Sequence, residues 1–218
     1  MIYTVTLNPA LDKTVQIPSF RLGEVNRISA MRTDPGGKGI NVSKVLRELG
    51  EPSVAAAILG GAAGQKIESA LRALGIEGMY LFTGHETRTN LKIVDPTLHT
   101  NTDVNEPGAP ADEAVLSKLL SQLTGRLRPG DLVVLSGKAP AGAPDTLYRD
   151  WILACRAAGA AVYLDAEGEL LRQGVTAGPA LIKPNQAELS GVMGRPLTTE
   201  DETIRAAQEL LAQGVGCV

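Results

Sequence analysis

Short, continuous apolar runs recur along the chain, and amphipathic stretches separate them. The runs span residues 2–7, 54–59, 132–135, 162–164 and 180–182. Strands that are apolar throughout, without alternation, are buried on both faces, as in parallel sheets covered by helices. The intervening stretches carry apolar residues at helical spacing, and four glycines follow them as candidate helix ends, namely Gly50, Gly75, Gly125 and Gly159. The sequence therefore predicts an α/β fold with one parallel sheet between two layers of helices.

Two polar segments interrupt this pattern, at about residues 12–34 and 88–107. They are rich in Thr and Asn, and their apolar residues come closer to alternating with polar ones than to forming continuous runs. Such strands are typical of a sheet with one solvated face. We expect the two segments to form a small antiparallel sheet that stands off the α/β body as a lid over a site.

The composition is that of a single globular domain, and it argues against several classes of function. The chain has 218 residues, a net charge of −3 and 3% aromatic residues, without a basic block. Nucleic-acid binding needs clustered Lys and Arg, so we expect no nucleic-acid partner. No apolar run is long enough to span a membrane, and the first residues do not form a signal peptide. Two unpatterned cysteines, Cys155 and Cys217, favour a reduced, cytoplasmic setting.

A glycine-rich turn precedes a helical pattern between Asp34 and Leu46. Its sequence, DPGGKGINVSKVL, places three glycines and Lys38 at the helix start, where free N–H groups and the helix dipole attract an anion. It is not a Walker A loop, because Gly39 follows the lysine where Ser or Thr is required. It is not a dinucleotide loop, because Val42 stands where the third glycine is required. The turn is therefore either another kind of anion site or only a tight turn.

Polar residues also follow predicted strands, at the edge where open α/β sheets bind ligands. Asp12 comes just after the first strand, where its carboxylate either accepts sugar hydroxyls or caps a turn. Arg88, within ETRTNLKI, is either a bidentate phosphate ligand or a solvated surface charge. Lys138, in VVLSGKAP, is either a cation of the site or a loop charge, and Asp165 is equally ambiguous.

Asn185 and Glu188 lie three residues apart in LIKPNQAEL, after the last predicted strand. Their oxygens suit the water shell of a single Mg²⁺, which prefers a few oxygen ligands and keeps its waters. The alternative is a capping box, with Asn185 as the N-cap and Glu188 at the third helical position. The sequence leaves both interpretations open.

Four segments, in this order and spacing across the whole chain, resemble the ribokinase-type (PfkB) carbohydrate kinases, and among them the hexose-phosphate branch. The segments are TLNPALD, GGKGINVSKVL, TRTN and LIKPNQAEL. The resemblance implies a single ribokinase-like α/β domain over residues 1–218, with a three-layer parallel sheet and a small β-sheet lid that often forms a homodimer contact. It implies ATP with Mg²⁺ as phosphoryl donor and a ketohexose phosphate as acceptor. TLNPALD and TRTN together favour fructose 1-phosphate, converted to fructose 1,6-bisphosphate, over tagatose 6-phosphate.

The resemblance also implies a role for each matching residue. Residues expected to contact the sugar phosphate are Asp12, Gly37, Lys38 and Asn41, with Arg88 on its phosphate and Arg27 as a weaker candidate. Those expected on the ATP–Mg²⁺ side are Lys183, Asn185 and Glu188, the last two near the metal through water. In this interpretation the glycine turn binds an anionic sugar rather than a nucleotide.

Two departures from the family pattern matter. The family usually has a small hydroxyl residue where Lys138 stands. The family's late Gly-Ala-Gly-Asp segment, which supplies the general base and an anion hole, does not occur in these 218 residues. We therefore expect no catalytic base in the chain, a fold whose C-terminal part is missing, and little kinase activity from the chain alone. A noncatalytic sugar-phosphate-binding protein is the alternative, and a nicotinamide oxidoreductase is disfavoured because no glycine fingerprint follows the first strand.

Overall fold

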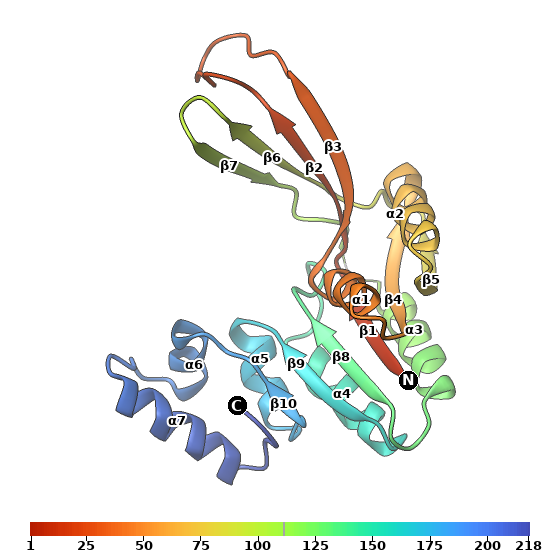
Figure 1. The fold of residues 1–218 in the computed structure, drawn as a ribbon. Helices are drawn as coiled ribbons and strands as arrows, with labels where there is room; N and C mark the ends of the chain where they lie inside the picture. The colour runs from red at the N-terminus through yellow and green to blue at the C-terminus, as the bar shows by residue number, and fades with distance from the viewer. Residues whose placement is uncertain (111) are drawn as a thin grey trace.

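The computed structural model describes residues 1–110 and 112–218, and a six-stranded parallel sheet runs through the body of the molecule (Figure 1). The strand order is β10-β9-β8-β1-β4-β5, and every neighbouring pair is parallel. Its strands are β1 (Ile2–Thr6), β4 (Ser53–Gly60), β5 (Glu77–Thr83), β8 (Leu132–Ser136), β9 (Ala161–Asp165) and β10 (Leu181–Ile182). The five predicted apolar runs all form strands of this sheet, and β5 adds an edge strand.

Helices cover both faces of the sheet, which confirms the predicted three-layer arrangement. One face carries α3 (Glu113–Arg126), α4 (Leu147–Ala157) and α5 (Gly168–Val175). The other face carries α1 (Lys38–Glu48) and α2 (Gly61–Ala73). Beyond the β10 edge, α6 (Gln186–Met193) contacts α5, and α7 (Glu200–Ala212) contacts α6 (Figure 1). None of the helices in the described part of the chain is long and apolar enough to cross a membrane.

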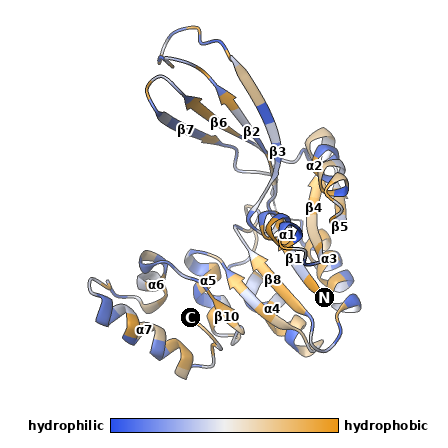
Figure 2. Ribbon diagram, viewed as in Figure 1, coloured by the Kyte–Doolittle hydropathy of each residue, from blue (hydrophilic) through white to orange (hydrophobic). Residues whose placement is uncertain are grey.

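The two faces of the sheet are covered unequally. The larger core lies under α3, α4 and α5, where Leu119 and Ile152 pack fully buried against strand residues such as Leu135. A smaller core under α1 and α2 centres on Ile40 and Ile67. Figure 2 shows the apolar residues concentrated on the strands of this sheet, as strands buried on both faces require.

Three of the four predicted helix-ending glycines are confirmed. Gly50, Gly75 and Gly159 follow α1, α2 and α4 with φ of 83°, 71° and 86°, a left-handed conformation that favours glycine. The prediction for Gly125 is wrong, because this residue lies inside α3. The apolar stripe of α3 continues to Leu127, which packs against the core, so packing carries the helix past the glycine.

The two polar segments form the lid, a separate sheet of order β3-β2-β6-β7. Its strands are β2 (Ala10–Gln16), β3 (Ala30–Gly36), β6 (Thr89–Asp95) and β7 (Thr100–Asn105). The β2–β3 and β6–β7 pairs are antiparallel, but β2 and β6 pair in parallel, so the lid is a mixed sheet and the prediction of a wholly antiparallel one is wrong. The reason is that β2 and β6 both leave the body and run outward, and each returns through its own hairpin partner (Figure 1).

One buried carboxylate ties the two hairpin loops of the lid together. Asp95 is 1% exposed, and it accepts backbone N–H groups of Ser19 and Phe20 from one loop, at 3.0 and 2.7 Å. From the other loop it accepts the N–H groups of Thr97 and Leu98, at 2.9 and 3.1 Å. Burial by itself would raise the pKa of Asp95, but these four hydrogen bonds outweigh it and hold the pKa below the ordinary range.

Candidate functional site

A cleft of about 400 Å³ lies where the lid joins the body. Three parts of the fold build it: the C-terminal ends of β1 and β8, the start of α1, and the base of the lid. Its lining residues are Thr6, Asn8, Gly37, Lys38, Arg88, Asn90, Asn105, Glu106, Pro107, Ser136, Gly137 and Lys138. The cleft therefore lies at the edge of the sheet where the sequence predicted a site.

The glycine turn packs the start of α1 directly against the end of β1. Gly37 has φ 122°, and a Cβ atom there would lie 2.5 Å from the Cγ2 atom of Thr6. The Oγ1 atom of Thr6 accepts the N–H group of Ile40 at 2.9 Å, which joins the helix to the strand. Within the described residues, α1 has neither a side-chain cap nor an acidic residue in its first turn. The structure thus shows a tight turn whose helix start presents Lys38 and backbone N–H groups, with no acidic residue in the first turn of the helix.

Arg88 is fixed at the base of the lid and is half-buried. Its Nη1 atom donates to Oδ1 of Asn90 at 3.1 Å and to the carbonyl oxygen of Glu106 at 3.0 Å. Its Nη2 atom donates to the carbonyl oxygen of Asn8 at 3.3 Å. Burial lowers the pKa of Arg88, with Asp12 and Glu106 opposing the shift, and an arginine stays protonated at neutral pH in any case. This is a positioned cation rather than a solvated surface charge.

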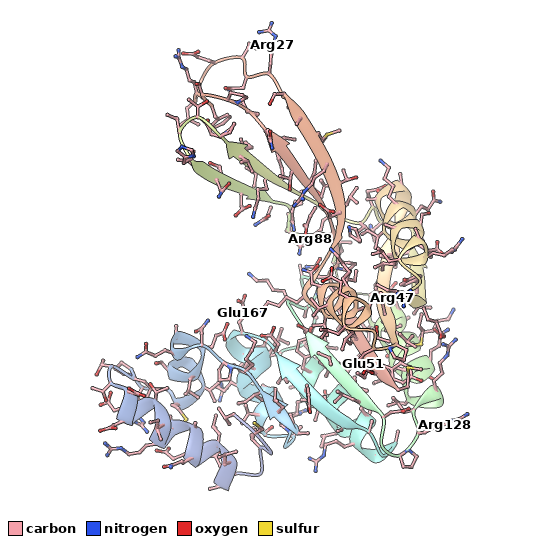
Figure 3. All side chains as sticks on the ribbon, viewed as in Figure 1. Arg27, Arg47, Glu51, Arg88, Arg128 and Glu167 are labelled. Atoms are coloured by element: carbon pink, nitrogen blue, oxygen red, sulfur yellow. The ribbon has the colours of Figure 1, made fainter. Side chains whose placement is uncertain are left out.

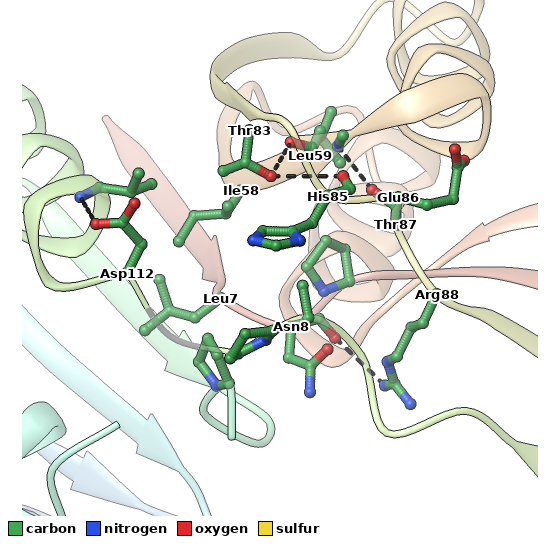
Figure 4. A pocket seen from close by; sticks show the side chains of 16 residues that line it. Leu7, Asn8, Ile58, Leu59, Thr83, His85, Glu86, Thr87, Arg88 and Asp112 are labelled. Carbon is green, nitrogen blue, oxygen red and sulfur yellow. Dashed lines mark hydrogen bonds between the residues drawn. The ribbon is translucent and has the colours of Figure 1, made fainter. Parts of the chain in front are cut away.

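The segment before Arg88 is clamped to the body. The N–H group of Gly60 donates to Oγ1 of Thr87 at 2.8 Å, and the Thr87 N–H group donates to the Gly60 carbonyl at 3.0 Å. Glu86 accepts two backbone N–H groups at the start of α2, at 3.1 and 2.6 Å. A small cavity of about 40 Å³ lies beside this segment, with His85 at its side (Figure 4). The clamp sets the position of Arg88 relative to the sheet.

Asp12 and Arg88 are connected through Asn90. Asp12 and Asn90 are paired residues on neighbouring strands of the lid, and Nδ2 of Asn90 donates to Oδ1 of Asp12 at 2.9 Å. A Cβ atom at Gly36 would overlap the Asp12 carboxylate, so any larger residue there would force this carboxylate to move. Asn90 is not among the residues predicted for the site, although it lies in the TRTN segment. Its spacing of two from Arg88 is the sequence signal that places both side chains on one face of an extended segment.

Asp165 is a second residue whose role in the site could not be settled from the sequence. Its Oδ1 atom lies 3.5 Å from the Nζ atom of Lys38 and 3.8 Å from that of Lys183. Its Oδ2 atom accepts the hydroxyl of Ser136 at 3.4 Å. Asp165 therefore links the glycine turn on the acceptor side to Lys183 on the expected nucleotide side.

Three expected sugar-binding residues do not line the cleft. Asp12 lines an adjoining hollow on the lid that shares Asn90 and Asn105 with the cleft. Asn41 is exposed on α1 and does not line it. Arg27 lies in the loop between β2 and β3, at the far end of the lid from Arg88 (Figure 3). The reason is geometric: two seven-residue strands carry that loop away from the body.

Asn185 and Glu188 form the capping box that the sequence offered as the alternative to a metal site. Oδ1 of Asn185 accepts the Glu188 N–H group at 2.9 Å, and Oε2 of Glu188 accepts the Asn185 N–H group at 2.9 Å. Over residues 1–110 and 112–218, no three metal-ligating side chains gather, and no hydrogen bond reaches Oε1 of Glu188. The free oxygen fits a water ligand of Mg²⁺, which is held through few protein oxygens.

Comparison with known proteins agrees with the fold. Residues 5–218 match the family described as pfkB family carbohydrate kinase, and the chain belongs to this family. It is 39% identical to a 1-phosphofructokinase of Rhodobacter capsulatus, covering 100% of this chain and 69% of the relative. It is 33% identical to a tagatose-6-phosphate kinase of Staphylococcus epidermidis, covering 95% of this chain and 67% of the relative. The structure of phosphofructokinase-2 from Escherichia coli in complex with fructose-6-phosphate matches with a TM-score of 0.93 and 31% identity, over 99% of this chain and 71% of that one.

Proposed function

We propose that this chain belongs to an ATP-dependent kinase that phosphorylates a ketohexose phosphate, with fructose 1-phosphate as acceptor and fructose 1,6-bisphosphate as product. The observation that carries the proposal is the hydrogen-bonded row of Arg88, Asn90 and Asp12. Through Asn90 it holds a phosphate-binding cation, Arg88 in the cleft, in fixed relation to a hydroxyl-accepting carboxylate, Asp12 in the adjoining hollow of the lid. Five similar proteins from five bacteria are named 1-phosphofructokinase, at 34–39% identity, which supports this acceptor.

In this proposal the sugar phosphate lies between the lid and the glycine turn. Asp12 accepts sugar hydroxyls, Arg88 and Lys38 bind the phosphate, and the backbone at Gly37 lets the ligand approach the helix start. Asn41 is assigned to the sugar by the family motif alone, since it lies outside the cleft lining.

The proposed nucleotide side lies at the β9–β10 edge, where Lys183, Asn185 and Glu188 follow one another. ATP supplies the transferred γ-phosphoryl group: the acceptor oxygen bonds to that phosphorus, the bond to the bridging oxygen breaks, and ADP and a proton leave. Lys183 provides positive charge here, and Oε1 of Glu188 is the oxygen free to meet a Mg²⁺-bound water.

We also propose a homodimer formed through the lid. Exposed apolar side chains gather on it, including Leu22, Val25, Met31 and Val104, which are 90%, 84%, 58% and 54% exposed. Apolar surface of this kind marks protein interfaces. Arg27, at the tip of the lid, would then serve the cleft of the second protomer rather than its own.

The two cysteines support a reducing, cytoplasmic setting for this reaction. Both are free thiols in the described part of the chain. Cys155 is fully buried, and burial raises its pKa to about 12, so this thiol is unreactive.

A second acceptor, tagatose 6-phosphate, is supported by the tagatose-6-phosphate kinase relative. Calorimetric titration of the 218-residue chain with fructose 1-phosphate, tagatose 6-phosphate and fructose distinguishes the candidates. We expect fructose 1-phosphate to bind most tightly and fructose most weakly. The proposal would be overturned if neither sugar phosphate bound, or if fructose bound as tightly as its phosphate.

A further inference from the structure

Lys138 departs from the family pattern, and the proposed function gives it no role. It lies in the loop after β8 and lines the cleft together with Lys38 and Arg88. Its Nζ atom lies 2.9 Å from Oε1 of Glu167, and the two side chains are 70% and 46% exposed. Figure 3 shows Glu167 at the rim of the body that faces the lid. An ion pair this exposed adds little to the stability of the fold, so stability does not explain why Lys138 is present. Its place in the lining of the cleft suggests a role in binding a ligand.

The strand order places Lys138 between the two halves of the proposed site. The acceptor residues gather around the end of β1 and the base of the lid, and the nucleotide residues follow β10. Strand β8 lies between β1 and β9 in the sheet. A phosphoryl group that moves from the nucleotide side to the acceptor side must therefore pass over the loop that carries Lys138.

The backbone beside Lys138 is fixed, while its side chain extends into solvent. Gly137 has φ 98°, its N–H group donates to the Asp165 carbonyl at 2.9 Å, and its carbonyl accepts the hydroxyl of Tyr148 at 3.0 Å. Lys38 lies beside this loop, because a Cβ atom on Gly137 would be 3.5 Å from the Cβ atom of Lys38. A lysine whose backbone is held in place can exchange one anionic partner for another by rotating its side chain alone.

Positive charge exceeds negative charge in the lining of the cleft, where Lys38, Arg88 and Lys138 face Glu106. Outside that lining, Asp165 pairs with Lys38 and Lys183, and Glu167 pairs with Lys138. A cleft lining with this surplus suits a ligand that carries more than one phosphate.

We propose that Lys138 binds the phosphoryl group as it is transferred and while it is part of the product, and that Glu167 holds the lysine when no ligand is present. The inference rests on the proposed function. It assigns to a lysine of this chain the position where the family has a small hydroxyl residue. Lys138 contacts the second phosphate of fructose 1,6-bisphosphate, and fructose 1-phosphate lacks that phosphate.

The test is calorimetric titration of wild-type and variant chains with fructose 1,6-bisphosphate and fructose 1-phosphate. Lys138→Ser should weaken bisphosphate binding about tenfold, the effect of losing one charge-assisted contact, and change monophosphate binding by less than about twofold. Glu167→Gln frees the lysine, so bisphosphate binding should tighten about two- to fivefold. That gain should disappear in the double variant.

The matched control is Glu209→Gln, which removes an ion pair of the same 2.9 Å length with Arg195, between α6 and α7 and outside the cleft. It should leave both affinities unchanged. Unchanged bisphosphate binding in Lys138→Ser, or equal losses for both ligands, would overturn the inference and leave the proposed function intact. A wild-type chain that binds neither sugar phosphate would instead overturn the proposed function and this inference with it.

Discussion

The proposed acceptor side and the proposed nucleotide side of the site are built differently. On the proposed acceptor side, Arg88 and Asp12 each hydrogen-bond to Asn90, and Glu86 and Thr87 clamp the segment before Arg88 to the body. These side chains are held in place before any ligand arrives. Such preorganisation reduces the ordering cost of binding.

The nucleotide side uses its polar residues for local structure. Asn185 and Glu188 cap α6, and the side chain of Lys183 is 76% exposed and 3.8 Å from Asp165. Lys183 must leave Asp165 before it can bind a nucleotide, whereas Oε1 of Glu188 is already free of hydrogen bonds within the described residues. In the proposed function, we therefore expect the chain to bind its sugar phosphate without nucleotide, and nucleotide binding to require a movement of Lys183.

Gly36→Ala should damage the acceptor side most. The new Cβ atom would overlap the Asp12 carboxylate and push it away from Asn90. Overpacking of this kind costs roughly 1–3 kcal/mol, so we expect fructose 1-phosphate to bind up to about 100-fold more weakly by calorimetry. Gly84→Ala is the control, because a Cβ atom there meets no described atom within 4 Å. Equal affinities for the two variants would show that Asp12 does not need its present position.

Asn90→Leu should have the next largest effect. It keeps the approximate size of the side chain but removes the hydrogen bonds to Asp12 and Arg88. Since Arg88 keeps two bonds to backbone carbonyls, we expect about tenfold weaker binding of fructose 1-phosphate, or roughly 1–1.5 kcal/mol. Asn90→Asp should be at least as harmful, because it sets a second carboxylate against Asp12. Wild-type affinity in both variants would contradict the role of Asn90.

Acid should loosen the lid before the body through Asp95. The folded-state pKa of this carboxyl is lowered, so its stabilising effect is present above its unfolded-state pKa of about 4 and is lost as pH falls through the folded value. Protection of the amides of residues 19, 20, 97 and 98 against hydrogen exchange, relative to the intrinsic exchange rate at each pH, should fall below about pH 4. Asp95→Asn should show the fast exchange already at neutral pH, with the body unchanged. Slow exchange at these amides in the variant would contradict the anchoring role.

Glu188→Gln should have the smallest effect. A glutamine can still accept the Asn185 N–H group, so only the charge near the start of α6 is lost, about 0.3–1 kcal/mol of stability. Fructose 1-phosphate affinity should stay within about twofold, while Mg²⁺-dependent binding of ATP weakens. An unchanged magnesium dependence would leave Glu188 with its capping role alone.

The main sheet could be predicted because its strands are apolar on both faces, a property that each segment carries locally. The edge strand β5 lacks that property: it opens with Glu77 and Gly78, both exposed, and it escaped prediction. The parallel pairing of β2 with β6 could not be predicted from the sequence either. Their paired residues, such as Asp12 and Asn90, are 78 positions apart, and nothing local to either strand specifies parallel pairing.

In the site, too, local features could be predicted and features that depend on strand pairing could not. Asp12, Lys38 and Arg88 could be selected because Asp12 follows a predicted strand, Lys38 begins a predicted helix and Arg88 lies at the start of a predicted polar strand. The spacing of Asn185 and Glu188 predicted a capping box only as one of two alternatives, and the structure decides for it. The bridging role of Asn90 and the shared contacts of Asp165 depend on strand register, which is known only once the strands are paired.

The most direct test of the difference between the two sides is binding of fructose 1-phosphate and of fructose to the chain without nucleotide. We would measure this binding by calorimetry on wild type, on Arg88→Ala and on a surface control, Arg72→Ala, whose residue lies on α2. If the acceptor side is preassembled around Arg88, wild type and Arg72→Ala should prefer the phosphorylated sugar about 10- to 100-fold. Charge-assisted bonds of roughly 1.5–3 kcal/mol account for that preference, so it should collapse in Arg88→Ala. Equal binding of both sugars by wild type, or a preference that survives Arg88→Ala, would contradict the account.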